Sequence, residues 1–255
     1  PPRAGVLSLG GVMDANEWDA TTDWIALWKS LSSLPDADRK LRLIANELCR
    51  PLLRPATDPV FHQLFTMSEA RVRGEVSGDA WDEWEDLYAA AEAAARAATT
   101  VVGRAIAWTV VGLGNDDHKL GRMVESLLHF YGCLAAIRAG VLQPDESVAE
   151  GRGLQTDRSY VTGRDETGPR VIAHMIREHT PNPFHPVAFS PSWRTEAVVG
   201  LARTMYESRD FAALPVLADA LDDAGCDQPD ILAHCRGPGP HVRGCWVVDL
   251  VLGRA

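Results

Sequence analysis

Apolar residues recur at helical spacing along most of this chain. Near the N-terminus, Trp24, Leu27, Trp28 and Leu31 fall at i, i+3, i+4 and i+7, which places them on one face of a helix over 16–34. Prolines and aspartates separate this helix from two similar patterns over 38–52 and 58–72. A long helical pattern follows over 81–111, with an Ala-rich middle that favours close helix packing, and another covers 120–142.

The C-terminal part shows the same period with clearer boundaries. The pattern predicts helices over 171–179, 198–206, 210–221 and 229–236. Pro215 fits the first turn of the third, Gly225 fits the residue after its end, and Asp227 fits the cap of the fourth. The last apolar run, 241–253, suits either a buried helix or a core strand. Its β-branched residues favour a strand, but the rest of the chain predicts no strand, so we predict a helix and an all-α fold, a helical bundle.

One segment breaks the periodic pattern. Residues 143–170 contain four glycines and no apolar period. A structureless stretch of this length is unusual inside a compact domain, and it indicates either a linker or a functional loop. We therefore predict a helical N-terminal region over 13–142, a polar connection over 143–170 and a helical C-terminal region over 171–255. Residues 1–12 precede Met13, a natural-looking start, and belong either to an upstream start or to non-native sequence.

Composition narrows the classes of partner. Asp and Glu outnumber Lys and Arg by 35 to 25, which gives a formal net charge of −10. An acidic chain repels phosphate backbones and anionic lipid, so we expect neither nucleic acid nor membrane as a partner. The basic stretch Arg39–Arg42 fits the solvated face of a helix. The five cysteines are an odd count and no secretory signal precedes them, which favours the reducing cytoplasm.

Residues with metal-binding chemistry gather in the last thirty positions. Cys226, His234, His241 and Cys245 would supply the four N and S ligands that a structural zinc site needs. If 241–253 is a helix, His241 and Cys245 share one face of it at i, i+4. The spacing matches no standard zinc finger and contains no C-x2-C pair. The alternative is that each cysteine packs as a small hydrophobe and each histidine satisfies a neighbouring polar group.

Asp249 is the one charged residue in the apolar run that ends the chain. A carboxylate is costly to bury without a partner, and Arg243, Arg236 or His241 could pair with it. We favour a buried contact of Asp249 with an arginine, such as Arg243, or with a histidine that holds the C-terminus in place, over a catalytic acid. The Gly237–Pro240 turn is no phosphate cradle, because its prolines lack the amide N–H groups that such a loop uses. No other catalytic or cofactor motif is present, so the sequence predicts no catalytic residue and no organic cofactor.

Two blocks of the sequence resemble a family of planctomycete-type bacterial proteins with an Ala-rich helical middle. The first block is 13–18 with 38–43 and Cys49–Arg50. The second and more specific block comprises the NPF-x-PV segment at 182–187, the segment 214–221 and the ending HCRGPGPHVRGCWVVDL at 234–250. The resemblance implies a bacterial origin. It brings no activity and no catalytic residue to carry over.

Three functional hypotheses remain. The absence of a convergent catalytic motif favours a non-catalytic interaction or regulatory module that binds a protein partner. A metal-dependent hydrolase built from His234, His241, Cys245 and Asp249 is the second. A structural protein whose C-terminal part is stapled by zinc is the third. Bound metal with an open coordination position would favour the second hypothesis, and a closed tetrahedron would favour the third.

Overall fold

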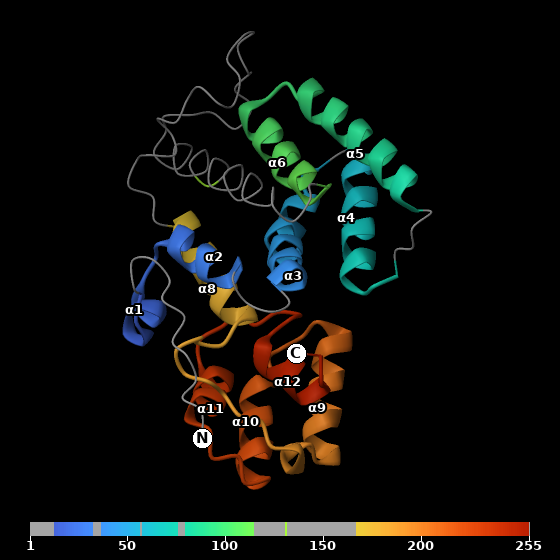
Figure 1. Cartoon of the computed structure of the whole chain (residues 1–255). Helices are drawn as coiled ribbons and strands as arrows, with labels where there is room; N and C mark the ends of the chain where they lie inside the picture. Colours follow the sequence, from blue (N-terminus) through green and yellow to red (C-terminus); the bar gives the residue numbers. More distant parts are fainter. Residues whose placement is uncertain are drawn as a thin grey trace. The chain divides into compact units, whose positions relative to one another are not determined.

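The computed structural model describes residues 13–32, 37–56, 58–75, 80–114, 131 and 167–254, which form helices joined by turns (Figure 1). These residues contain no β-strand, and the predicted all-α fold is confirmed. Apart from residue 131, the helix expected over 120–142 lies outside the described residues, as does most of the connection 143–170. The chain divides into two compact units, one of Pro35–Ile172 and one that combines Pro1–Leu34 with Ala173–Ala255.

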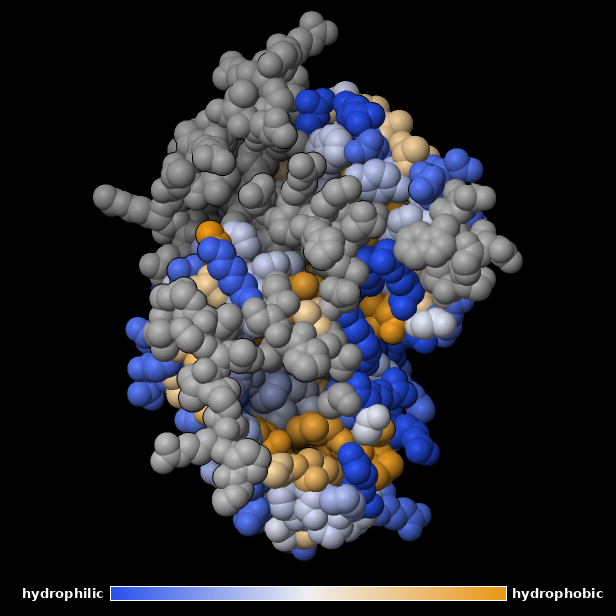
Figure 2. All heavy atoms as spheres, viewed as in Figure 1, coloured by the Kyte–Doolittle hydropathy of each residue, from blue (hydrophilic) through white to orange (hydrophobic). Residues whose placement is uncertain are grey.

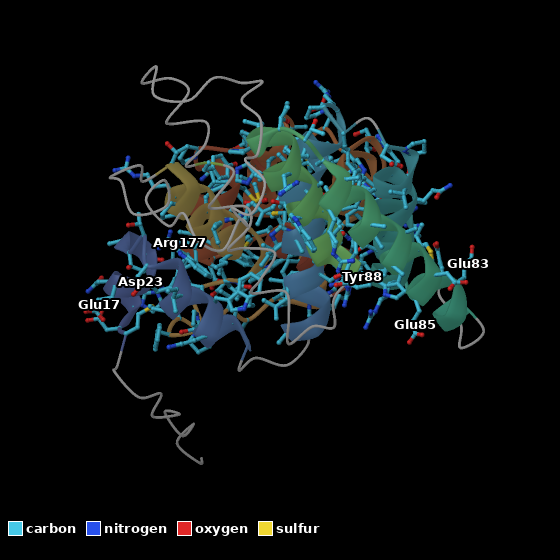
Figure 3. The ribbon with its side chains drawn as sticks, turned by 90° about the horizontal axis from the view of Figure 1, so that it is seen from above. Glu17, Asp23, Glu83, Glu85, Tyr88 and Arg177 are labelled. Carbon is cyan, nitrogen blue, oxygen red and sulfur yellow. The ribbon has the colours of Figure 1, made fainter. Side chains whose placement is uncertain are left out.

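The unit Pro35–Ile172 contains a group of packed helices. They are α3 (Ala37–Cys49), the short 3-10 turn η1 (Arg50–Leu53), α4 (Pro59–Val72), α5 (Ala80–Ala97), α6 (Val101–Val111) and η2 (Gly112–Gly114). Helix α4 packs against α3, α5 and α6. Ala91 and Ala95 of α5 are fully buried, which agrees with the close helix packing expected of the Ala-rich stretch. At the other end of α5, Glu83 and Glu85 project into solvent (Figure 3).

The single helix predicted over 81–111 is in fact two. The chain leaves the helical conformation at Ala98, and Thr100 caps α6 by accepting a 3.1 Å hydrogen bond from the amide of Gly103. The guanidinium of Arg104 donates to the freed carbonyl of Ala98 at 2.8 Å. A capping threonine and an arginine that satisfies an exposed carbonyl together stabilise the break, although the residues around it favour a helix.

The N-terminal pattern over 16–34 also forms two helices, α1 (Ala15–Ala20) and α2 (Trp24–Ser32). Helix α1 begins with a capping box in which the Asp14 side chain accepts from the amide of Glu17 at 2.8 Å and Glu17 accepts from the amide of Asp14 at 3.0 Å. Thr21, with an extended backbone, ends α1. The Asp23 side chain then accepts from the first amides of α2.

These two helices belong with the C-terminal helices, which differs from the predicted boundary at residue 142. Arg177 of α8 (Thr167–His179) contacts them: its guanidinium donates to the carbonyl of Trp18 at 2.7 Å and to that of Thr21. The Asn182 side chain donates to the carbonyl of Ala15 at 3.0 Å. Side chains beyond residue 170 thus bind carbonyls at both ends of α1.

Four further helices form the core of this unit: α9 (Glu196–Ser208), α10 (Leu214–Asp223), α11 (Pro229–Arg236) and α12 (Trp246–Leu252). Helix α9 packs against α10 and α12, and α11 packs against α10 and α12. The core of these helices is built from buried apolar side chains, and some apolar residues of this unit are also visible on its surface in Figure 2. Pro215 lies in the first turn of α10 and Gly225 follows its end with φ +84°, as expected. Gln228, not Asp227, is the cap of α11.

The last helix is shorter than predicted. The pattern indicated a helix from His241, but α12 begins at Trp246, and 237–245 form a loop. The prolines at 238 and 240 and the positive φ of Gly244 (+93°) keep this loop out of the helical conformation. At its other end α12 closes on Gly253, and Arg194 donates to the carbonyls of Leu250 and Val251 at 2.8 and 3.0 Å. The terminal run is therefore an anchored helix.

Candidate metal centre

The loop 237–245 lies along α8 and is fixed there by three neighbouring contacts. His174 lies 2.9 Å from the carbonyl of Pro240, and His179 lies 3.2 Å from the carbonyl of Arg243. Between them, the Glu178 carboxylate accepts from the amide of Val242 at 3.2 Å. His174 and His179 thus position the loop through its backbone. Carbonyl groups of a loop have no partner within a helix and need hydrogen-bond donors from elsewhere.

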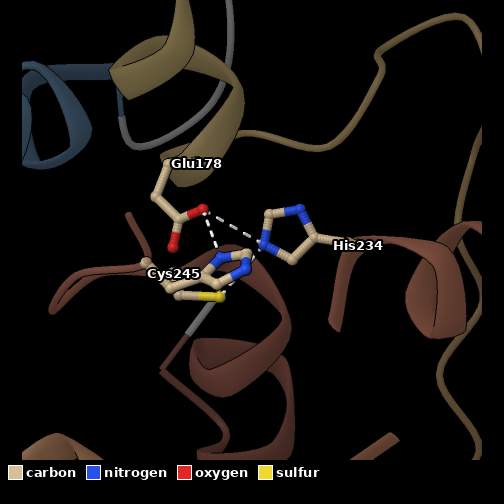
Figure 4. Close-up of side chains that lie close together, drawn as sticks. Glu178, His234 and Cys245 are labelled. Atoms are coloured by element: carbon tan, nitrogen blue, oxygen red, sulfur yellow. Dashed lines mark hydrogen bonds and ion pairs between the residues drawn. The ribbon is translucent and has the colours of Figure 1, made fainter. Parts of the chain in front are cut away.

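Four side chains converge where this loop meets α8 and α11. They are Glu178 from the last turn of α8, His234 from the last turn of α11, His241 from the loop and Cys245, which directly precedes α12 (Figure 4). One carboxylate oxygen, two imidazole nitrogens and the thiol sulfur all lie within 4.8 Å of one another. Glu178 and Cys245 are buried, and the two histidines are nearly so. We call these four residues the EHHC cluster.

Glu178 is the centre of the EHHC cluster. Its Oε2 lies 2.9 Å from Nδ1 of His241 and 3.3 Å from Nε2 of His234. Burial alone would raise the pKa of this carboxyl, but the hydrogen bonds and electrostatic interactions with the two histidines outweigh burial and lower the pKa to about 2. The carboxylate is therefore charged at neutral pH, although its side chain is only 1% exposed.

His241 forms the closer of the two contacts with Glu178. Burial lowers the pKa of this imidazole, but the hydrogen bond and charge of Glu178 raise it by more, with a smaller contribution from the carbonyl of Gly237. The pKa of His241 is therefore raised overall. Its Nε2 lies 3.4 Å from that carbonyl. Both ring nitrogens thus face oxygen acceptors, which favours the protonated ring. With metal on Nδ1, the proton on Nε2 would still have its acceptor, the arrangement common in metal sites.

His234 is held in one tautomer by a buried tryptophan. The indole Nε1 of Trp246 lies 3.1 Å from Nδ1 of His234. An indole nitrogen can only donate, so Nδ1 is the acceptor and the ring proton lies on Nε2. Nε2 in turn lies 3.2 Å from Sγ of Cys245 and 3.3 Å from Glu178. In the metal-free protein His234 therefore donates from Nε2 into the EHHC cluster.

Cys245 is fully buried, and burial raises the pKa of its thiol well above its usual value, as does the charge of Glu178. The nearby amides of Val248 and Val247 act in the opposite direction. The thiol therefore stays protonated unless a cation binds it. A bound metal would supply that positive charge, since coordinating thiols are deprotonated.

The arrangement does not suit nucleophilic catalysis. In a Cys–His pair the histidine must accept the thiol proton, and its other nitrogen must donate to an orienting group. Here His234 carries its proton on the nitrogen that faces Cys245, and its other nitrogen accepts from Trp246. Cys245 is also 0% exposed. The geometry fits ligands for a cation better than it fits a nucleophile and base.

Three of the four predicted metal ligands meet in the EHHC cluster, and Cys226 does not. Cys226 precedes α11 and its amide donates to the carbonyl of Leu221 at 2.9 Å, whereas His234 lies in the last turn of the same helix. The length of α11 thus separates Cys226 from the cluster, and its side chain packs in the hydrophobic core. His241 and Cys245 do lie close together. They do not share one face of a helix as predicted, because His241 lies in the loop.

Glu178 is the cluster residue that the sequence analysis missed. Val171, Met175 and Glu178 are spaced i, i+4 and i+7 on α8, and the last two are buried. A carboxylate on the buried stripe of a helix, one residue before a histidine, was the available signal. Nothing local connects it with His241, which is 63 residues away in the sequence.

Asp249 is buried on α12, as its apolar neighbours indicated. Two of its three suggested partners form ion pairs elsewhere: Arg236 with Asp219 and Asp222, and His241 with Glu178. Arg243 donates to the carbonyl of Tyr206 at 2.6 and 3.0 Å. The pairing of Asp249 with Arg243 stays a prediction.

Comparison with protein-family models, with curated proteins and with solved structures finds no match for this chain. The resemblance to planctomycete-type proteins therefore stays a prediction. In the described ranges, no helix combines the length and the apolar content that crossing a bilayer requires.

Proposed function

We propose that this protein is a non-catalytic, metal-binding module whose C-terminal helices are stapled by one zinc ion. The observation that carries the proposal is the convergence of Glu178, His234, His241 and Cys245 within 4.8 Å. The four ligands come from α8, α11, the loop and the start of α12. One ion bound there would join segments that are otherwise connected by hydrogen bonds and packing, which is how structural zinc stabilises small folds.

The ligand types favour zinc over other cations. Zinc accepts carboxylate oxygen, imidazole nitrogen and thiolate sulfur, and bonds of about 2.0 to 2.3 Å place tetrahedral ligands about 3.3 to 3.8 Å apart. The separations of 2.9, 3.2 and 3.3 Å in the EHHC cluster lie at or a few tenths of an ångström below this range, so small outward shifts of the side chains would admit the ion. Calcium and magnesium prefer oxygen ligands only, and a single carboxylate does not satisfy them.

A structural role fits the closed ligand set better than a catalytic role does. A catalytic zinc keeps one position open for water or substrate, whereas four protein ligands fill a tetrahedron. One observation favours the metal-dependent hydrolase. A depression of about 370 Å³ is lined by Phe211, Pro215 and the cluster residue His241, among others. A hydrolase would need His241 to leave the metal, and the His241–Glu178 contact opposes that movement.

Metal analysis of the protein, purified without chelator, tests the proposal. We expect about one zinc per chain, coordinated by one sulfur, two nitrogens and one oxygen in X-ray absorption spectra. The Cys245→Ser variant should lose the metal. Cys226→Ser is the matched control, because Cys226 is an equally buried thiol of the same core outside the EHHC cluster.

Folded protein that neither carries zinc nor binds added zinc would disprove the metal proposal. Zinc with three protein ligands and a bound water would instead favour the hydrolase. Zinc retained by Cys245→Ser and lost from Cys226→Ser would show that another ligand set holds the ion.

The wider role that we propose is a cytoplasmic interaction module with a protein partner and no nucleic-acid partner. The support is the acidic composition together with a site whose ligand geometry suits stapling. A native pull-down before and after chelation tests whether partner binding needs the stapled form. Equal recovery of a partner in both states would separate the metal site from that role.

A further inference from the structure

We infer that Trp246 lowers the metal affinity of the EHHC cluster by holding His234 in the tautomer that cannot bind metal. This inference rests on the proposed metal site and adds a regulatory residue to it. It would make zinc binding readily reversible, so that the C-terminal staple responds to the zinc supply.

The first step concerns which nitrogen of His234 carries the proton. Trp246 is 6% exposed and its indole N–H points at Nδ1 of His234 at 3.1 Å. The two rings are 5.0 Å apart at 54°, so they also pack against each other. A neutral imidazole has one donor and one acceptor, and this contact makes Nδ1 the acceptor.

The second step concerns what a metal needs from the same ring. The cluster reaches His234 through Nε2, which faces both Glu178 and Cys245. A neutral histidine that binds metal through Nε2 must carry its proton on Nδ1, where an acceptor normally receives it. In this protein the group that faces Nδ1 of His234 is instead a donor, the indole N–H of Trp246. Binding therefore requires the Trp246–His234 hydrogen bond to break and leaves two donors facing each other.

The other metal-binding histidine shows the opposite arrangement. With its Nδ1 directed at Glu178, the remaining nitrogen of His241 lies 3.4 Å from the carbonyl of Gly237, an acceptor. His241 is thus ready for metal and His234 is not. The difference lies in one side chain, Trp246, which directly follows the ligand Cys245 in the sequence and so moves with it.

Replacement of the donor tests the inference. Trp246→Phe keeps an aromatic ring in the core and removes the N–H group. We expect it to bind zinc about tenfold more tightly than the native protein in a competition titration with a chromophoric chelator, because a buried hydrogen bond no longer has to break. Trp193→Phe is the matched control: Trp193 is 7% exposed in the same core, outside the EHHC cluster, and should leave the zinc affinity unchanged.

A second measurement on the native protein does not depend on the variant. Long-range ¹H–¹⁵N spectra should show His234 protonated on Nε2 without zinc and on Nδ1 with zinc, while the Trp246 indole N–H signal shifts. A zinc-free His234 with its proton on Nδ1 would overturn the inference.

The variant separates the two proposals. If Trp246→Phe and Trp193→Phe both bind zinc as the native protein does, Trp246 has no tuning role and the metal site stands. If the native protein and both variants bind no zinc, the metal site itself fails.

Discussion

Oε2 of Glu178 lies 2.9 Å from Nδ1 of His241, although 63 residues separate them in the sequence. The contact joins the last turn of α8 to the loop before α12, and the same oxygen lies near His234. A buried carboxylate with such neighbours is costly to leave unpaired, so the metal-free protein needs the histidines as donors. A metal bound as we propose would therefore compete with protons for the same atoms.

We predict that the stability of the metal-free protein is greatest between about pH 4.5 and 6.5. The pKa of Glu178 is lowered from 4.5 to about 2, so its contribution is complete above 4.5 and is lost as the pH falls through 2. The pKa of His241 is raised above 6.5 by Glu178, against the effect of burial, so its contribution is complete below 6.5 and is lost as the pH rises through the raised value. Urea unfolding of chelator-treated protein as a function of pH measures this.

Zinc should reverse the loss of stability that the metal-free protein shows as the pH rises above 6.5. Binding must displace protons from His241 and Cys245, so zinc affinity rises with pH and each binding event releases protons. The zinc-bound protein should therefore gain stability from pH 6 to 8, where the metal-free protein loses it. Parallel curves with and without zinc would contradict the shared use of these atoms by metal and proton.

Arg177 is predicted to hold the N-terminal helices α1 and α2 in place. Its guanidinium donates to the carbonyls of Trp18 and Thr21 at the end of α1. Arg177→Ala should lower the free energy of unfolding by about 1 to 3 kcal/mol, because partly buried carbonyls lose charged donors. Hydrogen exchange should become faster in 15–24 than in α10. Arg203→Ala, an exposed arginine on α9, is the control. Equal exchange in both variants would assign the docking of α1 to packing alone.

Asp249 is predicted to stabilise the end of the chain through Arg243. Asp249 is 5% exposed, and removal of one partner of a buried charged pair costs about 3 to 5 kcal/mol. Asp249→Ala should therefore lower the melting temperature markedly, whereas Asp223→Ala, an exposed aspartate on α10, should not. A double-mutant cycle with Arg243→Ala should give a coupling of about 1 kcal/mol or more. An unchanged melting temperature, or no coupling, would refute the pairing.

The sequence alone determined the helical fold and several of its boundaries. Pro215, Gly225 and the end of α11 at Gly237 lie where their local chemistry placed them, because a helix terminus depends on residues within about one turn. The sequence also indicated three of the four cluster residues, since Cys and His residues gather near the end of the chain. It misplaced the start of α12, because the prolines and Gly244 acted together with contacts to α8 that no local pattern contains.

Only the tertiary structure decided the fourth residue of the EHHC cluster, the grouping of α1 with the C-terminal helices, and the tautomer of His234. Each of these depends on pairs distant in sequence or on the direction of one hydrogen bond: Glu178 with His241, Arg177 with Trp18, and Trp246 with His234. Spacing along a chain reports which face of a helix a residue occupies. It does not report which other helix that face meets, because packing of the whole unit decides that contact.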